Sequence, residues 1–324
     1  MGRPSPRVRL REVRIRDSNA GFLFPVVAIS LLASSYPAKA GGEDPGRSGD
    51  LPSTKEAHAA PSDLSLADFF TRGWNEEWTH RERFTPDMAL LRVTTNFLER
   101  EFRADYSRTD VRGNPSLDTT QMANGLIAYG LNRRLMLEVI SNYQWNLSNG
   151  DVTASGGGGG ALVRTQLVDT ATSSAALQVK VAFPNKGIGQ TQTSLTYALA
   201  AWQDLHTLLP ALGRVGLYES IQLESLQGPS KPGARTSDLS GDISLAKTWT
   251  GPDTPGFGNF TTFVEFFATR DLNGDSSGQT IASITPGIRT WFARKNSVTL
   301  GVDLPLGRPG SFYRVLRATY ILNF

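Results

Sequence analysis

The chain contains no cysteine among its 324 residues. Disulfide bonds and cysteine-ligated metal sites are therefore excluded. Downstream of residue 40 the chain also lacks any apolar run of the roughly 18 residues that a membrane-spanning helix needs. If the chain is exported, these absences leave a secreted soluble protein or a closed β-barrel, because only helices and closed barrels satisfy every backbone hydrogen bond in lipid.

Residues 1–40 have the three parts of a secretory signal peptide. An arginine-rich stretch from Met1 to Asp17 precedes the apolar run at 21–33, and Ala38-Lys39-Ala40 forms a small-residue cleavage motif. An uncleaved anchor is the alternative, but the apolar run is shorter than the roughly 20 residues that cross a bilayer. We expect cleavage after Ala40. Residues 1–40 carry seven of the basic residues and two of the acidic ones, so the remaining chain has a net charge of about −2 and no nucleic-acid partner is expected.

Three further regions follow the signal peptide. Residues 41–62 are rich in Gly, Pro, Ser and charge and are interpreted as a flexible linker. Residues 63–88 are expected to form an N-terminal arm or a short amphipathic helix, for which Ser65 and Asp68 could supply a capping box. Residues 89–324 are assigned to a membrane barrel.

The barrel assignment rests on alternation of apolar and polar residues with a period of two. In the segment 297–304, Val298, Leu300, Val302 and Leu304 alternate with Thr299, Gly301 and Asp303. Successive side chains of a strand face opposite sides, so such a segment has one apolar and one polar face. Twelve segments of this kind can be delimited: 89–107, 119–131, 134–147, 159–169, 173–184, 191–204, 213–226, 236–249, 259–270, 279–292, 296–304 and 312–324. The pattern predicts an all-β fold, a closed antiparallel transmembrane barrel of about 12 strands within a range of roughly 10–14.

The C-terminal segment is the strongest local indication of an outer-membrane barrel. Its apolar face comprises Leu316, Ala318, Tyr320, Leu322 and the terminal Phe324. A last strand with a terminal aromatic residue resembles the signal that the barrel-insertion machinery recognises in outer-membrane proteins. The last strand of a soluble sandwich is the alternative.

The polar face of the segments supplies candidate pore-lining residues. A charge on the lipid side costs roughly 2–4 kcal/mol at mid-membrane, so charged side chains should face the interior. The candidates are Arg92, Asn96, Glu138, Asn142, Lys180, Asp242, Glu265, Arg289, Asp303 and Arg317. They are expected either to select permeants or to pair with one another and fill a narrow interior.

Two further patterns concern loops and interfaces. The glycine run at 155–160 lacks the Lys-Ser/Thr of a phosphate-binding loop and is interpreted as a flexible outer loop. Trp145, Trp202, Trp249 and Trp291 lie near the ends of predicted strands, as expected for aromatic girdles at the membrane interfaces. The three histidines are scattered without an HExxH spacing, and no Gly-x-Ser-x-Gly motif occurs. No enzymatic activity, metal or cofactor is therefore expected.

Several segments resemble the MetA-pathway phenol-degradation family of outer-membrane barrels. These are the stretch from Ala128 to Glu138 (AYGLNRRLMLE), Val179 to Gly189 (VKVAFPNKGIG), ITPGIRTWFARKNSVTLGVDLPLG at 284–307 and YRVLRATYILNF at the C-terminus. Phe183-Pro184-Asn185 departs from the Pro-Thr-Gly turn that is more common in the family. The resemblance implies a barrel that passes small hydrophobic or aromatic molecules, and it assigns no individual substrate residue.

These observations predict a monomeric channel in the bacterial outer membrane that transports a small molecule passively and contacts membrane lipid and the insertion machinery. A structural or surface-binding barrel without an open pore is the alternative, and an outer-membrane enzyme is a third.

Overall fold

The computed structural model describes residues 61–324 except Met88, 112–117, Gly189, Lys231, Arg294 and 308–311. The predicted signal peptide lies outside the described residues, as does the predicted linker up to residue 60. No helix in the described part of the chain is long and apolar enough to cross a membrane.

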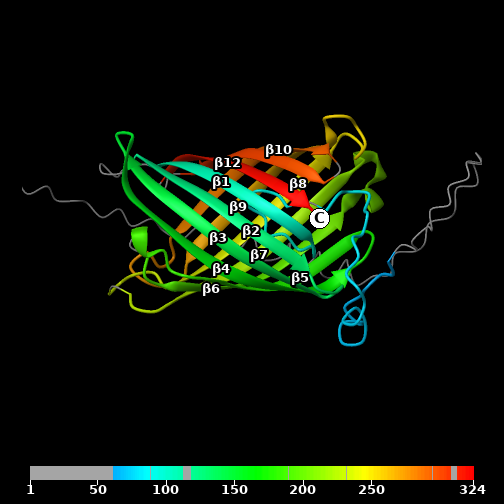
Figure 1. Cartoon of the computed structure of the whole chain (residues 1–324), viewed down its shortest axis with the longest axis horizontal. Helices are drawn as coiled ribbons and strands as arrows, with labels where there is room; N and C mark the ends of the chain where they lie inside the picture. Colours follow the sequence, from blue (N-terminus) through cyan, green and yellow to red (C-terminus); the bar gives the residue numbers. More distant parts are fainter. Residues whose placement is uncertain are drawn as a thin grey trace, which may run out of the picture.

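The described chain is a closed barrel of twelve antiparallel strands in which each strand pairs with its neighbours in sequence (Figure 1). The strands are β1 (Arg100–Val111), β2 (Thr119–Gly130), β3 (Leu135–Ser148), β4 (Asp151–Asp169), β5 (Ser173–Ala182), β6 (Thr193–Asp204), β7 (Val215–Gln227), β8 (Ser237–Thr248), β9 (Gly258–Asp271), β10 (Thr280–Ala293), β11 (Asn296–Leu306) and β12 (Phe312–Asn323). Three short 3₁₀ turns, η1 (Lys186–Ile188), η2 (Leu205–Thr207) and η3 (Pro210–Leu212), lie in the connections. The predicted fold class is confirmed, including the strand number.

The last strand closes the barrel by pairing with the first. Phe102 is opposite Leu322 and Tyr106 is opposite Ala318 in the β1–β12 register. The backbone N–H of Phe324 donates to the carbonyl of Arg100 at 3.0 Å. Leu316, Tyr320, Leu322 and Phe324 are exposed on the outside of the wall, as the alternating pattern predicts.

The outside of the wall is apolar. Ile127, Val139, Leu177 and Ile288 are all exposed there, with 66% of Val139 accessible. The inside contains many buried polar side chains, among them Glu219, Asp242 and Glu265. This distribution is the reverse of that in a soluble domain, and it suits a wall with lipid outside and a polar interior.

Two predicted strand boundaries are wrong. The first strand begins at Arg100 and not at residue 89, because residues 89–99 lie inside the barrel. The glycine run at 155–160 is not a loop but part of β4, which turns directly from β3 through Asn149 and Gly150, both with positive φ. A side chain at Gly156 would place Cβ 2.2 Å from the Asn185 Oδ1 atom, so the β5–β6 connection packs against this bare stretch of wall.

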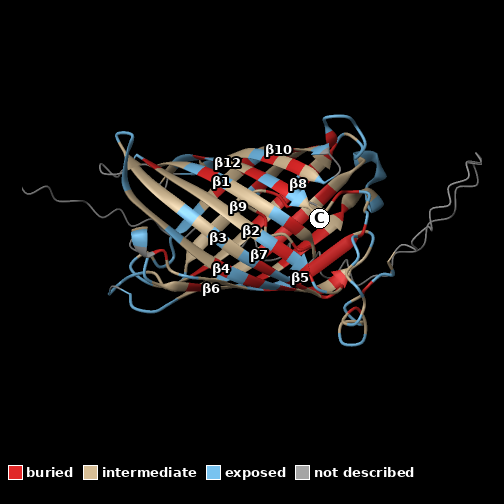
Figure 2. Cartoon of the chain, viewed as in Figure 1, coloured by how far each residue is buried: buried red, intermediate tan, exposed pale blue. Residues whose placement is uncertain are grey.

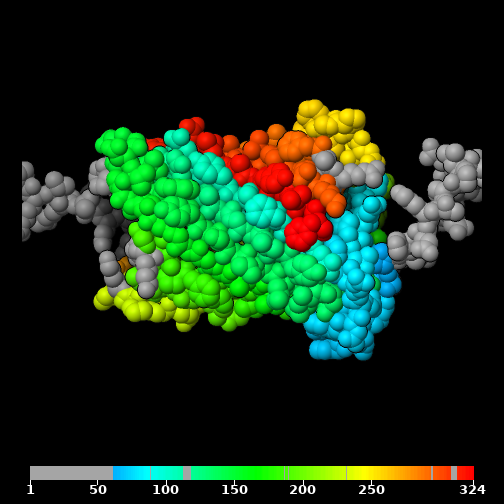
Figure 3. Space-filling model, viewed as in Figure 1, coloured from blue at the N-terminus to red at the C-terminus, as the bar shows by residue number. Residues whose placement is uncertain are grey.

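The N-terminal arm lies across the end of the barrel that carries the C-terminus, called here the terminal end (Figure 3). Leu64 and Asp169 exchange two backbone hydrogen bonds of 2.8 Å, which fix the arm to the end of β4. The predicted capping box forms, since Ser65 N donates to Asp68 Oδ2 at 2.9 Å and Asp68 N to Ser65 Oγ at 3.3 Å. The residues that follow form turns and bends.

A segment that fills the barrel interior

The described residues 84–87 and 89–98, called here the luminal segment, run through the barrel interior near the terminal end. Arg164 of β4 donates to the carbonyl of Phe97 at 2.6 Å, and Gln222 of β7 donates to Thr94 Oγ1 at 2.7 Å. Arg289 of β10 donates to the carbonyl of Ala89 at 3.2 Å. Because these strands lie on different sides of the barrel, the segment crosses the lumen and does not follow one wall.

Carboxylates on the wall hold the centre of this segment. Glu265 of β9 accepts hydrogen bonds from the backbone N–H groups of Arg92 and Val93, both at 3.0 Å. Asp303 of β11 accepts a bond of 2.8 Å from Arg92 Nη1 and another of 2.8 Å from Arg317. Both wall carboxylates are fully buried. These donors lower the cost of burying the two carboxylates, and Glu265 Oε2 is left buried without a partner in the described residues.

An apolar cluster covers the other side of the segment. Leu90, Val93 and Phe97 pack against Trp202 of β6 and Tyr218 of β7, and the cluster also contains Ala246 and Phe263. The rings of Phe97 and Trp202 meet edge to face with centroids 5.6 Å apart. Trp202 is 1% exposed, so the prediction that it anchors the wall at the membrane interface is wrong. Trp249 is exposed on the outside, as that prediction requires.

Glycines in the wall make room for the segment. A Cβ atom at Gly301 of β11 would lie 2.4 Å from Leu91 Cδ1, and one at Gly287 of β10 would lie 2.2 Å from the ring of Phe263. The two glycines are opposite each other in the register of β10 and β11. The wall is therefore thinnest where Leu91 meets it, which allows close approach of the segment.

The predicted pore-lining residues fall into two groups. Eight lie on strands with their side chains on the inner face: Glu138, Asn142, Lys180, Asp242, Glu265, Arg289, Asp303 and Arg317. The prediction that Arg92 and Asn96 lie on a strand is wrong. Both residues lie on the luminal segment. The strand residues differ among themselves in burial, and Figure 2 shows that buried positions gather toward the terminal end where the segment lies. Asn142 and Lys180 are only half-buried.

The structure brings four of the predicted residues together and leaves others apart. Arg92, Glu265, Asp303 and Arg317 form one network of hydrogen bonds and ion pairs. Asp242 instead accepts from Ser220 at 2.7 Å, and Glu138 lies 3.9 Å from Arg164. The alternating pattern predicts that these carboxylates face inward. It does not predict their partners, because the partners come from distant parts of the chain.

Sequence analysis missed two arginines that position the arm. Arg134, in the β2–β3 turn, is fully buried and donates to the carbonyls of Arg72, Gln166 and Leu167 at 2.8 to 3.0 Å. Arg83 pairs with both Asp87 and Asp169 where the segment enters the barrel. An arginine that satisfies several backbone carbonyls fixes irregular chain that has no ladder of its own. The only feature of the sequence that could have indicated this role is the position of these arginines next to tight turns.

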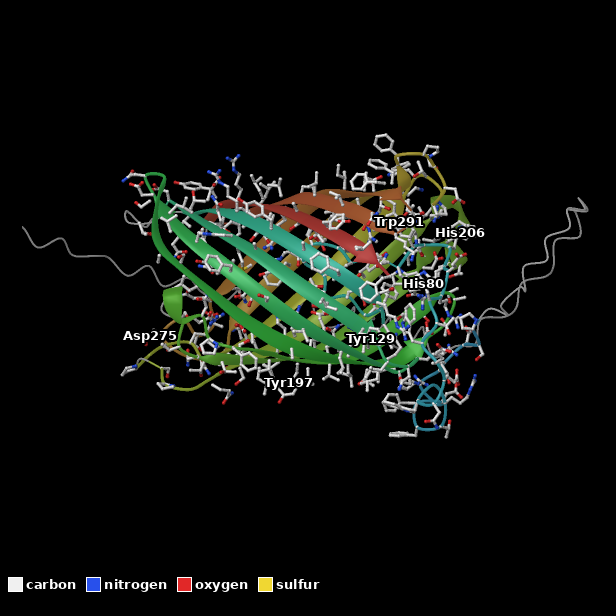
Figure 4. All side chains as sticks on the ribbon, in the orientation of Figure 1. His80, Tyr129, Tyr197, His206, Asp275 and Trp291 are labelled. Carbon is white, nitrogen blue, oxygen red and sulfur yellow. The ribbon has the colours of Figure 1, made fainter. Side chains whose placement is uncertain are left out.

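Titratable groups crowd the place where the luminal segment enters and leaves the barrel. The adjacent Glu99 side chain raises the pKa of His80 to about 9, against the opposing effect of burial. Burial raises the pKa of Asp87 to about 6, although the neighbouring Arg83 favours the charged carboxylate. Figure 4 shows His80 at the same end of the barrel as Trp291 and opposite to Asp275.

A cavity of about 700 Å³ opens at the terminal end, beside the luminal segment. Its lining includes Phe97 of the segment, Arg289 and Trp291 of β10, and the C-terminal Phe324. Charged and aromatic groups thus alternate around it. A cavity of this size and lining can hold a small molecule.

The comparisons with known proteins concern the fold. No family model and no curated protein matches the chain. Among solved structures, an outer-membrane channel from Pseudomonas putida F1 is similar with a TM-score of 0.51 and 11% identity, over 70% of this chain and 96% of that one. The NanC porin is also similar, with a TM-score of 0.47 and 8% identity over 69% of this chain and 98% of that one. The KdgM porin has a TM-score of 0.44 and 9% identity over 69% of this chain and 99% of that one.

The closed sheet and its apolar outer surface, together with the likeness in fold to the Pseudomonas channel, define the chain as a β-barrel of the bacterial outer membrane. The resemblance to the MetA-pathway family has no support from a matching family model.

Proposed function

We propose that the protein is a monomeric outer-membrane channel for small molecules whose pore is narrowed by the luminal segment. The observation that carries the proposal is that wall side chains such as Glu265, Arg164 and Gln222 hold the backbone and side chains of the segment through individual hydrogen bonds, in addition to the apolar cluster. A net hydrogen bond contributes about 0.5–1.5 kcal/mol, or about 1.5–3 kcal/mol where one partner is charged, so water that enters the pore can replace a few such contacts when the segment shifts.

The lining of the path indicates the class of permeant. Phe97 and Trp291 line the terminal-end cavity together with Arg289 and Glu101. This mixture suits small hydrophobic or aromatic molecules that carry a polar group. The resemblance of several segments to the phenol-degradation barrels supports the same class. Diffusion down a gradient would need no cofactor.

The same segment favours a second candidate, a barrel without an open pore. Leu90, Val93 and Phe97 contact a wall cluster that extends from β6 to β9, and Leu91 meets β11. If these contacts are permanent, the barrel is closed and its function resides in its surface. The two candidates differ in whether the segment leaves a conducting path.

Recording from planar bilayers distinguishes the two candidates. The purified protein should show discrete conductance steps, and Glu265→Ala should raise the open probability because two backbone N–H groups of the segment lose their acceptor. Val264→Ala is the matched control, since the residue neighbours Glu265 on β9 but faces outward. Conductance steps in the parent, with a higher open probability in Glu265→Ala and an unchanged one in Val264→Ala, support the narrowed channel. Silence of both proteins at every voltage supports the closed barrel and contradicts the channel.

A further inference from the structure

Three side chains with metal-ligating atoms meet at the neck of the luminal segment. His80 lies before the segment, Asp87 in its first turn and Glu99 directly after it. One ligand atom from each lies within 4.8 Å of the other two. His80 Nδ1 is 3.7 Å from Glu99 Oε2. The cluster therefore joins the point where the chain enters the barrel to the point where it leaves. No other such group occurs in the described ranges between 61 and 324.

The carboxylate of Asp87 provides an independent indication of a ligand. Its side chain is 6% exposed, and its Oδ2 atom is paired with Arg83. Its Oδ1 atom is buried and has no hydrogen-bond partner. A buried carboxylate oxygen without a donor is costly, because desolvation is not compensated. Arg83 holds Asp87 in place, and the Asp87 carboxylate is one of the three groups of the cluster.

The donor set indicates the kind of ligand. One imidazole nitrogen and two carboxylate oxygens suit divalent transition metals, and Zn²⁺ commonly takes three protein ligands of these types. The two carboxylates balance the charge of a divalent cation, while Arg83 is already balanced by its second partner, Asp169. All three residues line the terminal-end cavity, which leaves room for water or another small ligand in the remaining coordination positions.

We propose that His80, Asp87 and Glu99 bind a divalent transition-metal ion that ties the two ends of the luminal segment together. His80 and Glu99 lie on either side of the segment in sequence, so an ion bound to both closes the segment into a loop. Closing the loop restricts the positions that the segment can adopt inside the barrel. Metal binding does not require that the barrel conduct.

Zinc binding by the full-length protein in detergent tests the site. Zn²⁺ is titrated in competition with a chromophoric chelator, and one ion per chain is expected. His80→Ala and Asp87→Asn should each weaken binding by more than about tenfold, since even the residues that support metal ligands affect affinity on that scale. His206→Ala is the control, because His206 lies at the same end of the barrel but stacks on Phe84 outside the cluster.

A second measurement distinguishes metal bound by the three ligands from metal bound elsewhere on the surface, and from an effect of unfolding in the variants. Co²⁺ in place of Zn²⁺ should give a visible absorption band in the parent protein and in His206→Ala, and no band in Asp87→Asn. Heat-modified migration in electrophoresis, retained by every variant, shows that the barrel is intact. Equal Zn²⁺ affinity in the parent and His80→Ala would overturn the proposal, as would an equal loss in His206→Ala.

Discussion

Asp303 of β11 and Arg92 of the luminal segment form an ion pair of 2.8 Å although 211 residues separate them in sequence. Asp303 also accepts from Arg317 at 2.8 Å and from Thr285 Oγ1 at 2.8 Å, and none of its side chain is exposed. One carboxylate is therefore shared by two guanidinium groups inside the barrel. The charge that a permeating ion meets at this depth depends on that balance.

Asp303→Asn should shift the channel toward anion selectivity. The substitution removes the negative charge and leaves Arg92 and Arg317 without their shared partner. A change of about 1 kcal/mol in local electrostatic energy corresponds to roughly a fivefold change in the permeability ratio. The reversal potential under a potassium chloride gradient measures that ratio.

The matched control is Asp151→Asn, which removes the same charge from an exposed position at the start of β4, far from the terminal end. Its reversal potential should stay close to that of the parent. Equal shifts in the two variants would show that Asp303 does not line the conducting path.

Val139→Arg should impair insertion into lipid, whereas Gln144→Arg should not. The two residues lie on opposite faces of β3, with Val139 outside and Gln144 inside. An arginine on the lipid face costs about 2–4 kcal/mol near the bilayer midplane, and an inner position avoids this cost. Folding yield in phospholipid vesicles at increasing urea concentration measures the difference. Identical yields would contradict the assignment of the two faces.

Phe324→Ala should slow assembly in cells without changing spontaneous refolding of the purified chain. Phe324 is half exposed and contributes only a backbone hydrogen bond to closure with β1. We propose that this half-exposed side chain is recognised by the insertion machinery. The amount of folded protein in the outer-membrane fraction measures assembly. Phe312→Ala removes an aromatic ring at the other end of β12 and is the control. An equal assembly defect in Phe312→Ala would contradict a recognition signal at Phe324.

Period-two alternation was sufficient to predict most of the barrel. Strands β2, β3 and β5 to β12 begin and end within about two residues of the predicted spans. A membrane strand keeps one apolar and one polar face along its length, so its sequence alone specifies its orientation. The inward-facing carboxylates Glu265 and Asp303 follow from the same rule.

The luminal segment could not be predicted in this way, because Leu91, Val93 and Phe97 alternate like a strand but pack inside the barrel. The predicted span 89–107 is much longer than the roughly 9–11 residues that cross the membrane, which is the only warning in the sequence. Trp202 was misplaced for a related reason. A wall facing a water-filled pore would be polar, and only a segment in the lumen makes a buried tryptophan favourable there.

A reversible tether between the luminal segment and the wall tests the central claim most directly. The chain has no cysteine, so Leu91→Cys with Gly301→Cys creates a single possible disulfide at a point where the two residues already touch. Single-channel conductance is recorded before and after reduction, with Leu91→Cys alone as the control. We predict low conductance in the oxidised double variant and recovery on reduction. Conductance that is the same in both states would show that the segment does not control the pore.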